Sequence, residues 1–161
     1  MARETTFPRV FAIIADGITG AAIGADRTIA QIAPAAGQAV AIEEIIVTST
    51  EVTEDETCNV KVIAQDDDGT FTLTPADVIA SVLNPGQTFN GDLYYLATVE
   101  PTDSAARNML RHSETIRLGV CGYMRFLPGS LIIYPGERFG VVLRDTAGGV
   151  IYTVKIVCSY E

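Results

Sequence analysis

The chain has no tryptophan, one histidine and only three cysteines, and these shortages exclude several kinds of functional site. His112 alone cannot build a cupin-type site or a facial triad, because each of those metal sites needs at least two histidines. Cys58, Cys121 and Cys158 lie far apart and form no CxxC pair, so we expect buried thiols rather than metal ligands. We therefore expect the protein to hold no metal and no other cofactor.

Long hydrophobic runs are also missing. The longest nearly apolar stretch, residues 10–15, is far shorter than a membrane-spanning helix requires. Arg3 and Glu4 lead into no adequate secretory h-region. We expect a protein that is made in a host cytoplasm and has no membrane partner.

Basic residues are scarce in one part of the chain. The net charge is −9, and residues 43–77 contain ten acids against one base, Lys61, so the remaining chain is close to neutral. Phosphate backbones repel such an acidic region, and we expect no nucleic-acid partner. The length of 161 residues and the hydrophobic content of 48% fit one folded domain, which we assign to residues 10–161 after an extended arm at residues 1–9.

What the chain does contain is alternation of apolar and polar residues, which is typical of β-strands. Residues 150–160 place one apolar set on a single face: Val150, Tyr152, Val154, Ile156, Cys158 and Tyr160. Residues 138–144 form the preceding strand, and residues 145–149 form the loop that joins the two. We expect further strands at residues 10–15, 39–53, 57–64, 70–73, 93–99, 115–126 and 131–134. Many short strands separated by Gly, Pro and Asn predict an all-β, antiparallel, jelly-roll-like sandwich.

Three segments are expected to depart from this pattern. Thr74 is a hydroxyl N-cap before Pro75, and Asn84-Pro85-Gly86 is a stop signal, so we predict one short helix at about residues 75–83. Residues 104–112 are expected to form another turn or two of helix. Residues 17–37 are rich in Gly and Ala and poor in alternation, and we expect a long surface excursion there.

The stretch AQDDDGTFTL, residues 64–73, contains three consecutive carboxylates and a glycine. An EF-hand loop aligned on Gly69 would need a ligand at Ala64 and a glutamate at Pro75, so that motif is excluded. A different calcium site, with Asp66 and Asp68 joined by Glu54 or Glu56, stays open. Asp-Gly is a strong hairpin signal, and we expect a solvated turn between two strands.

No stretch of the chain has the pattern of a catalytic site. The segment DGITG, residues 16–20, lacks both the GxGxxG spacing and the lysine of a P-loop. Nothing around the cysteines resembles a nucleophile elbow or an activated thiolate. Tyr94 and Tyr95 are adjacent and point to opposite faces of a strand, so together they make a poor platform for a sugar. We expect no enzymatic activity.

The segment YPGERFGVVLRDTAGGVIYTVKI, residues 134–156, resembles the closing hairpin of jelly-roll auxiliary proteins on tailed-phage heads, the decoration or cement proteins. The resemblance implies a structural virion protein, a homotrimer seated on the shell of major capsid protein at the head surface. Jelly-roll lectins, tumour-necrosis-factor-like trimers and phage fibre heads share such turns. A carbohydrate- or receptor-binding module is therefore the alternative, followed by a small hydrolase.

The arm at residues 1–9, MARETTFPR, is the candidate partner-binding segment. Arg3, Phe7 and Arg9 are its expected contact residues, because arginine makes planar bidentate contacts and an isolated aromatic side chain can anchor an interface. We expect the arm to lie on the surface of the capsid partner.

Overall fold

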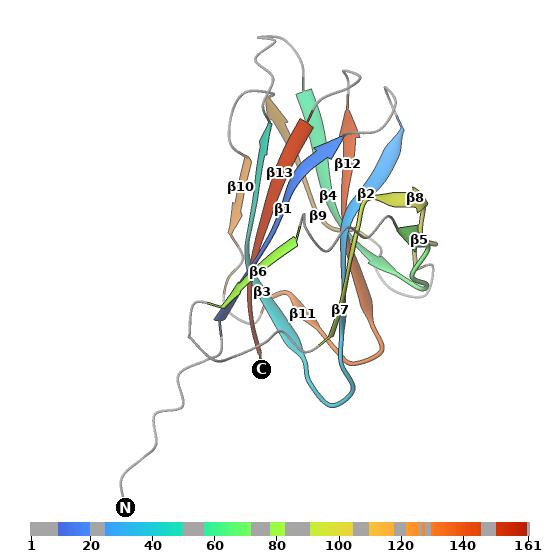
Figure 1. Ribbon diagram of the computed structural model, residues 1–161, viewed down its shortest axis with the longest axis vertical. Helices are drawn as coiled ribbons and strands as arrows, with labels where there is room; N and C mark the ends of the chain where they lie inside the picture. The colour runs from blue at the N-terminus through green and yellow to red at the C-terminus, as the bar shows by residue number, and fades with distance from the viewer. Residues whose placement is uncertain are drawn as a thin grey trace, which may run out of the picture.

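The computed structural model describes residues 10–19, 25–49, 57–71, 78–82, 91–104, 110–117, 122–125, 127, 130–145 and 151–160. Within these residues lie thirteen β-strands and no helix. Two antiparallel sheets contain most of the described residues, and a short two-stranded ribbon stands beside them (Figure 1).

The two large sheets have their strands in a fixed order. Sheet A runs β10 (Gly122–Arg125), β3 (Val40–Ser49), β13 (Ile151–Tyr160), β1 (Val10–Thr19), β6 (Val78–Val82), and β11 (Ile132–Ile133) also pairs with β3. Sheet B runs β7 (Gly91–Tyr95), β2 (Asp26–Pro34), β12 (Arg138–Asp145), β4 (Thr57–Gln65), β9 (Leu110–Arg117). The ribbon pairs β5 (Thr70–Phe71) with β8 (Ala97–Val99).

Eight of these strands have the connectivity of a jelly roll. The chain alternates between the sheets from β1 to β4, and again from β9 and β10 to β12 and β13. As a result β1, β13, β3 and β10 are neighbours in sheet A, and β2, β12, β4 and β9 are neighbours in sheet B. This is the two-sheet, eight-stranded arrangement of a jelly roll, and the prediction of an all-β, jelly-roll-like sandwich is confirmed.

The core lies between the two sheets, where one face of each strand contributes alternate side chains. In β13 the predicted apolar face is confirmed, because Tyr152, Val154, Ile156 and Cys158 are all buried. The facing strands of sheet B contribute two sets of buried side chains in the same way: Cys58, Val60 and Val62, and Phe139, Val141 and Leu143. Alternation of apolar residues therefore decides which face of each strand turns inward.

The chain between β4 and β9 extends both sheets and adds the ribbon. β6 pairs with β1 at one edge of sheet A, and β7 pairs with β2 at one edge of sheet B. The ribbon lies beside β7 and β2: Phe71 stacks on Tyr94 on the outer face of sheet B, and Arg27 Nε donates to the carbonyl of Ala97 over 3.2 Å. Thr28 and Gln31, on the outer side of β2, are fully buried.

The predicted helix at about residues 75–83 is wrong over its described part. Residues 78–82 form β6, with Ile13 opposite Ala80 in an antiparallel pair. Val78, Ile79 and Val82 are β-branched and favour a strand, and the edge of β1 supplies backbone hydrogen-bond partners. Tertiary pairing therefore overrides the local cap signal; residues 72–77 and 83–90 lie outside the described residues.

The surface excursion expected at residues 17–37 is also wrong over its described part, because residues 17–19 end β1 and residues 26–34 form strand β2 in the interior of sheet B; residues 20–24 lie outside the described residues. Ile29, Ala30 and Ile32 belong to the buried core. Gln31 is buried on the opposite side of the strand, so the burial of β2 is almost continuous. A strand that is covered on both faces does not show clean alternation, and this is why the pattern failed to reveal it.

Two expected hairpins are absent from the described strands. β12 belongs to sheet B and β13 to sheet A, so the chain crosses the sandwich between them and the resemblance to a closing hairpin does not hold. Likewise β4 pairs with β9 and β12 rather than with β5. In the region of the second expected helix, residues 110–112 begin strand β9, and residues 105–109 lie outside the described residues.

Candidate functional site

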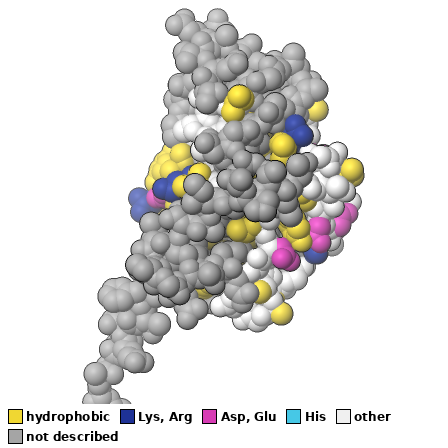
Figure 2. All heavy atoms as spheres, in the orientation of Figure 1, with side chains coloured by type: hydrophobic (Ala, Val, Ile, Leu, Met, Phe, Trp, Pro, Cys, Tyr) yellow, Lys and Arg dark blue, Asp and Glu magenta, His cyan; other side chains and the backbone are white. Residues whose placement is uncertain are grey.

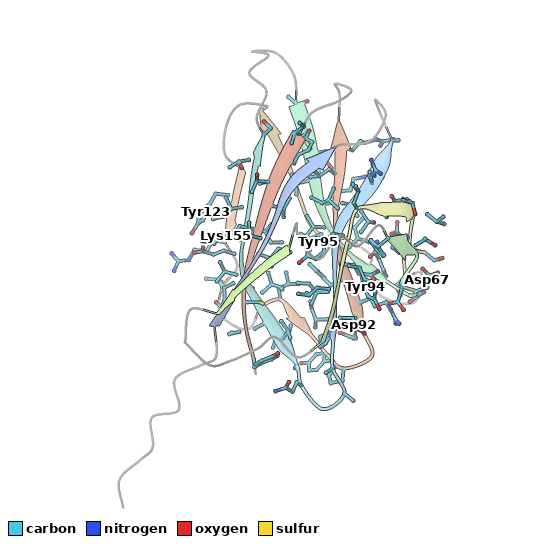
Figure 3. All side chains as sticks on the ribbon, in the orientation of Figure 1. Asp67, Asp92, Tyr94, Tyr95, Tyr123 and Lys155 are labelled. Carbon is cyan, nitrogen blue, oxygen red and sulfur yellow. The ribbon has the colours of Figure 1, made fainter. Side chains whose placement is uncertain are left out.

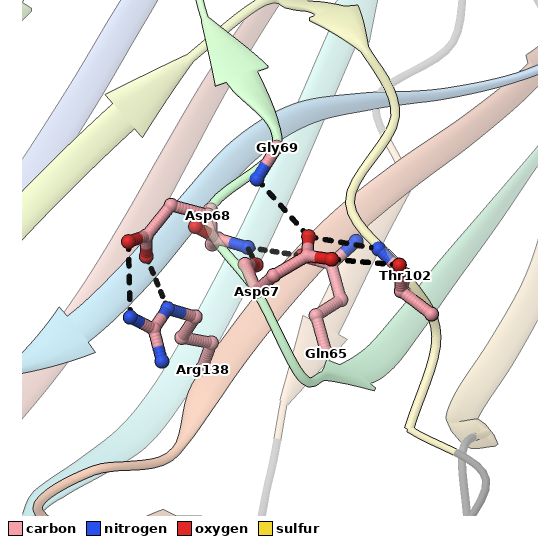
Figure 4. Close-up of polar contacts among 7 residues, drawn as sticks. Gln65, Asp67, Asp68, Gly69, Thr102 and Arg138 are labelled. Atoms are coloured by element: carbon pink, nitrogen blue, oxygen red, sulfur yellow. Dashed lines mark hydrogen bonds and ion pairs between the residues drawn. The ribbon is translucent and has the colours of Figure 1, made fainter.

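The acidic turn at residues 66–69 is held by its own carboxylates (Figure 4). Asp67 Oδ1 accepts hydrogen bonds from the backbone N–H groups of Gly69 at 3.1 Å and Thr102 at 3.0 Å. Its Oδ2 accepts from the Thr102 hydroxyl at 2.7 Å. These donors, above all the Thr102 hydroxyl, lower the pKa of Asp67, since they bond best to the ionised carboxylate. Asp67 thus joins the turn to the segment after β8.

Asp68 forms the second link of the turn, this time to β12. Its carboxylate makes a two-point ion pair with the guanidinium of Arg138, in which Arg138 Nη2 donates to Asp68 Oδ2 over 2.9 Å and Nε donates to Oδ1. The bond from Arg138 to Asp68 raises the pKa of the arginine. Planar two-point pairing fixes geometry as well as charge, so the turn is attached to sheet B at a defined position.

The expectation of a solvated turn is therefore only partly met. Asp66, Asp67 and Gly69 are exposed, and Gly69 adopts the left-handed conformation with φ +57°. The carboxylates of Asp67 and Asp68 already bond to groups of the protein, and in the part of the chain that is described no group of three or more His, Cys, Asp or Glu gathers as metal ligands. Glu54 and Glu56 lie outside that part, so the absence of a metal stays a prediction.

Beneath the turn, buried amides form a hydrogen-bonded network that sequence reasoning missed. Gln31 Nε2 donates to Gln65 Oε1 at 2.7 Å and to the backbone carbonyl of Asp67 at 2.9 Å. Gln65 Nε2 in turn donates to the Thr28 hydroxyl at 3.0 Å. Gly140 leaves the room for this network, because an added Cβ there would lie 2.4 Å from Gln65 Oε1. The sequence does not reveal that a glutamine in a strand belongs to a buried network, because its hydrogen-bond partners come from other parts of the chain.

The two adjacent tyrosines point to opposite sides of β7, as expected (Figure 3). Tyr95 lies in the core, where burial raises the pKa of its phenol. Tyr94 lies on the outer face of sheet B and stacks on Phe71 of the ribbon, with ring centroids 5.3 Å apart and an interplanar angle of 25°. Burial and the charges of Asp68 and Asp92 raise the pKa of Tyr94. The ribbon thus supplies Tyr94 with an aromatic partner that its sequence neighbours could not.

The groups considered for nucleophilic chemistry do not form a site among the described residues. Cys58 and Cys158 are buried, as expected, and form no disulfide among the described residues; burial raises the pKa of the Cys158 thiol to about 12. A thiol with so high a pKa is almost wholly protonated near neutral pH and is a poor nucleophile. His112 belongs to strand β9 opposite Val62 and not to a loop, and Cys121 lies outside the described residues.

Large hydrophobic side chains are exposed near β10 and β11. Leu127 is 78% exposed, Tyr134 is 56% exposed and Tyr123 is 49% exposed. The hydroxyl of Tyr123 donates to Glu44 Oε1 over 2.8 Å, and this bond raises the pKa of Tyr123. At the left of the view, where β10 lies, Figure 2 shows hydrophobic side chains beside basic ones.

The three residues expected to contact a partner, Arg3, Phe7 and Arg9, lie outside the described residues, as does the whole arm at residues 1–9. The described residues contain no helix long and apolar enough to span a bilayer. They define an all-β protein with two antiparallel sheets packed as a sandwich. In comparisons with known proteins, no family model and no curated protein matches the chain.

Proposed function

We propose that the protein is a capsid decoration protein, a structural component of the virion that binds the surface of a tailed-phage head and stabilises its shell. The observation that carries the proposal is the jelly-roll order of the eight strands, an architecture found in viral capsid proteins as well as in lectins and cupins. Since one fold serves several functions, the assignment also draws on the surface of the molecule.

That surface supports a protein-binding role. Leu127, Tyr134 and Tyr123 each expose a large hydrophobic side chain to solvent, and such side chains can serve as contacts for another protein. Aromatic side chains are also enriched at the centres of protein interfaces. These residues suit a protein whose work is to bind another protein.

The proposed protein acts as a homotrimer on the head surface, with the shell of major capsid protein as its partner. Apolar surface that the strands at residues 42–47 and 131–134 left uncovered would favour such an assembly. Much of the apolar surface of these strands is buried within one sandwich, including Ile45, Val47, Leu131 and Ile133. What a trimer would add to the proposed function is avidity, because three copies that engage one lattice together need only modest affinity each.

The test is to mix the intact protein, and a variant that lacks residues 2–8, with undecorated capsids from the same source. We expect the intact protein to bind, and the shortened variant to bind at least about tenfold more weakly, roughly 1.4 kcal/mol. Equal affinity of the two proteins for the capsid would show that the arm does not contribute to the interface. No binding of the intact protein would overturn the proposed function.

A second candidate function is saccharide binding, and the Phe71–Tyr94 stack is the observation that favours it. Aromatic rings offer apolar faces and edges to sugar C–H groups. Asp92 is exposed, and the Tyr94 hydroxyl hydrogen-bonds to it, so a carboxylate that could accept sugar hydroxyls lies beside the stack. Specific signal on a glycan array, lost in a Tyr94→Ala variant, would favour this function over capsid decoration.

A further inference from the structure

The outer faces of the two sheets differ, and the difference bears on how the protein docks. On sheet B the turn at residues 66–69 and the ribbon lie over part of the outer face, where Thr28, Gln31 and Gln65 are buried. On sheet A the outer face carries partly exposed apolar side chains. We define this outer face of sheet A by six residues: Ile14, Ile46, Tyr123, Arg125, Lys155 and Val157.

The strand register places these side chains together. Ile45 and Val47 of β3 point into the core, as do Val154 and Ile156 of β13, so Ile46 and Lys155 between them point outward. Tyr123 lies opposite Ile46, Ile46 lies opposite Lys155, and Lys155 lies opposite Ile14. One transverse row therefore crosses four strands of sheet A, and Figure 3 shows Tyr123 and Lys155 on the side away from Tyr94.

Lys155 is the unusual member of this row. It is partly buried, and isoleucines lie on both sides of it, at positions 46 and 14. The ion pairs that the described residues form are Lys61 with Asp26, Arg144 with Asp26, and Arg138 with Asp68, and none involves Lys155. An ammonium that has no ion-pair partner among the described residues and lies between two isoleucines is costly to cover unless the covering partner supplies an opposite charge.

The carboxylates that lie beside this face already have hydrogen-bond partners. Arg125 is exposed and lies opposite Glu44 in the strand pair, and the carboxylate of Glu44 accepts the hydroxyl of Tyr123. The carboxylate of Glu43, next to Glu44 in β3, accepts a hydrogen bond from the hydroxyl of Ser159, so both neighbouring carboxylates are already engaged, whereas Lys155 has no ion-pair partner among the described residues. By charge complementarity this face fits a partner that carries negative charge within an apolar surface.

We propose that the outer face of sheet A is the surface that docks on the capsid shell, and that the shell protein places a carboxylate against Lys155 inside an apolar contact. This inference rests on the proposed function, and it adds the face and the chemistry of the partner surface. Ile14, Ile46 and Val157 supply the apolar contact, Tyr123 and Arg125 lie at its edge, and Lys155 sets the charge of the partner.

The first experiment exploits the fact that the chain has only two lysines, Lys61 and Lys155. Lys61 lies on the outer side of sheet B, where its ammonium is 2.8 Å from Asp26. We compare the capsid affinity of Lys155→Met with that of the matched control Lys61→Met, and add Lys155→Arg to restore the charge. We expect Lys155→Met to bind at least about tenfold more weakly and the other two variants to bind within about threefold of the parent.

The second experiment is a zero-length carbodiimide cross-link between the intact protein and undecorated capsids, followed by peptide mass spectrometry. We expect Lys155 to be joined to an aspartate or glutamate of the shell protein. A cross-link from Lys155 to another copy of this chain would overturn the inference and assign the face to self-association. Intact capsid binding in Lys155→Met would overturn it as well, while leaving the proposed function standing; failure of the intact protein to bind any capsid would instead remove the function.

Discussion

Gly140 is the residue on which the buried amide network depends. A Cβ at this position would lie 2.4 Å from Gln65 Oε1 and 2.6 Å from Gln65 Cδ, and Gln65 is held by hydrogen bonds to Gln31 and Thr28. Because Gln65 cannot move away without breaking those bonds, we expect Gly140→Ala to lower the free energy of unfolding by about 1–3 kcal/mol. Urea denaturation measures the change.

A double-mutant cycle identifies the cause of that loss. Gln65→Ala removes the side chain with which the new Cβ collides, at the expense of the network itself. If the collision explains the effect, adding Gly140→Ala to Gln65→Ala costs much less than adding it to the parent protein. Equal costs in both backgrounds would show that Gly140 has another role.

The lowered pKa of Asp67 predicts how the free energy of unfolding depends on pH. Its carboxylate pKa is lower in the folded chain than the ordinary value of 3.8, chiefly because of the Thr102 hydroxyl. The ionised group therefore contributes stability at neutral pH, and that contribution is lost as the pH falls below 3.8 and through the folded pKa. We expect Asp67→Asn to be less stable than the parent at neutral pH, and the difference to shrink in acid.

The measurement is the free energy of unfolding in urea, for parent and variant, at pH about 7 and about 3. Burial raises the pKa of Asp103, which acts in the opposite direction, so only the difference between parent and variant is informative. Asp66→Asn is the matched control, because Asp66 is exposed and its carboxylate accepts no hydrogen bond from the described residues. A difference between parent and Asp67→Asn that stays constant across the pH range would contradict the prediction.

At the scale of the strand, β2 differs from the sequence-based expectation, because it is buried and not at the surface. Ile29 is fully buried at the centre of the core, within a segment whose composition suggested a surface loop. We expect Ile29→Ala to destabilise the protein by about 2–5 kcal/mol, because it removes apolar contacts and leaves a cavity. Urea unfolding again provides the measurement.

Ile151 supplies the control for this experiment, since it is 41% exposed at the start of β13. Its replacement by alanine should cost less than about 1 kcal/mol. Similar losses for Ile29→Ala and Ile151→Ala would mean that β2 contributes no more to the core than an exposed strand end.

Strand β6 forms in a segment whose flanking residues are typical of a helix. Thr74, Pro75 and the Asn84-Pro85-Gly86 stop are reasonable helix signals, yet residues 78–82 pair with β1. A cap contributes about 1 kcal/mol, whereas each strand residue gains backbone hydrogen bonds and cross-strand contacts along the edge of a sheet. A cap that contributes so little free energy does not decide the structure of a segment that can pair with the edge of a neighbouring strand.

At the scale of the whole molecule, the proposed trimer gives a direct prediction. Size-exclusion chromatography with light scattering should give three times the chain mass of 17.2 kDa at micromolar concentration. Closed assembly protects the edges of both sheets, which end at β10, β6, β7 and β9 among the described strands. A mass equal to that of one chain would contradict the trimer and, with it, the argument that avidity strengthens binding to the shell.

Several features of this protein could be predicted from its sequence. Alternation assigned the buried face of β13 at Tyr152, Val154, Ile156 and Cys158, because a strand that separates core from solvent must alternate. The spacing of Gly, Pro and Asn likewise indicated an all-β sandwich. The Pro-Gly pair before Glu137 is typical of a turn, and Gly136 has φ +82° with the Glu137 N–H bonded to the carbonyl of Tyr134. Each of these features depends on residues that are close together in the chain.

The remaining features depend on residues that are far apart, so only the tertiary structure decided them. β12 and β13 were assigned as neighbours, but each pairs inside a different sheet. Asp67 and Asp68 bind Thr102 and Arg138, which lie 35 and 70 positions further along the chain. Lys155 stands beside Ile14 and Ile46 only because β13 runs between β1 and β3. A strand's own sequence specifies its two faces, whereas its neighbours, and therefore the surface that a partner meets, follow from how the whole chain buries its apolar side chains.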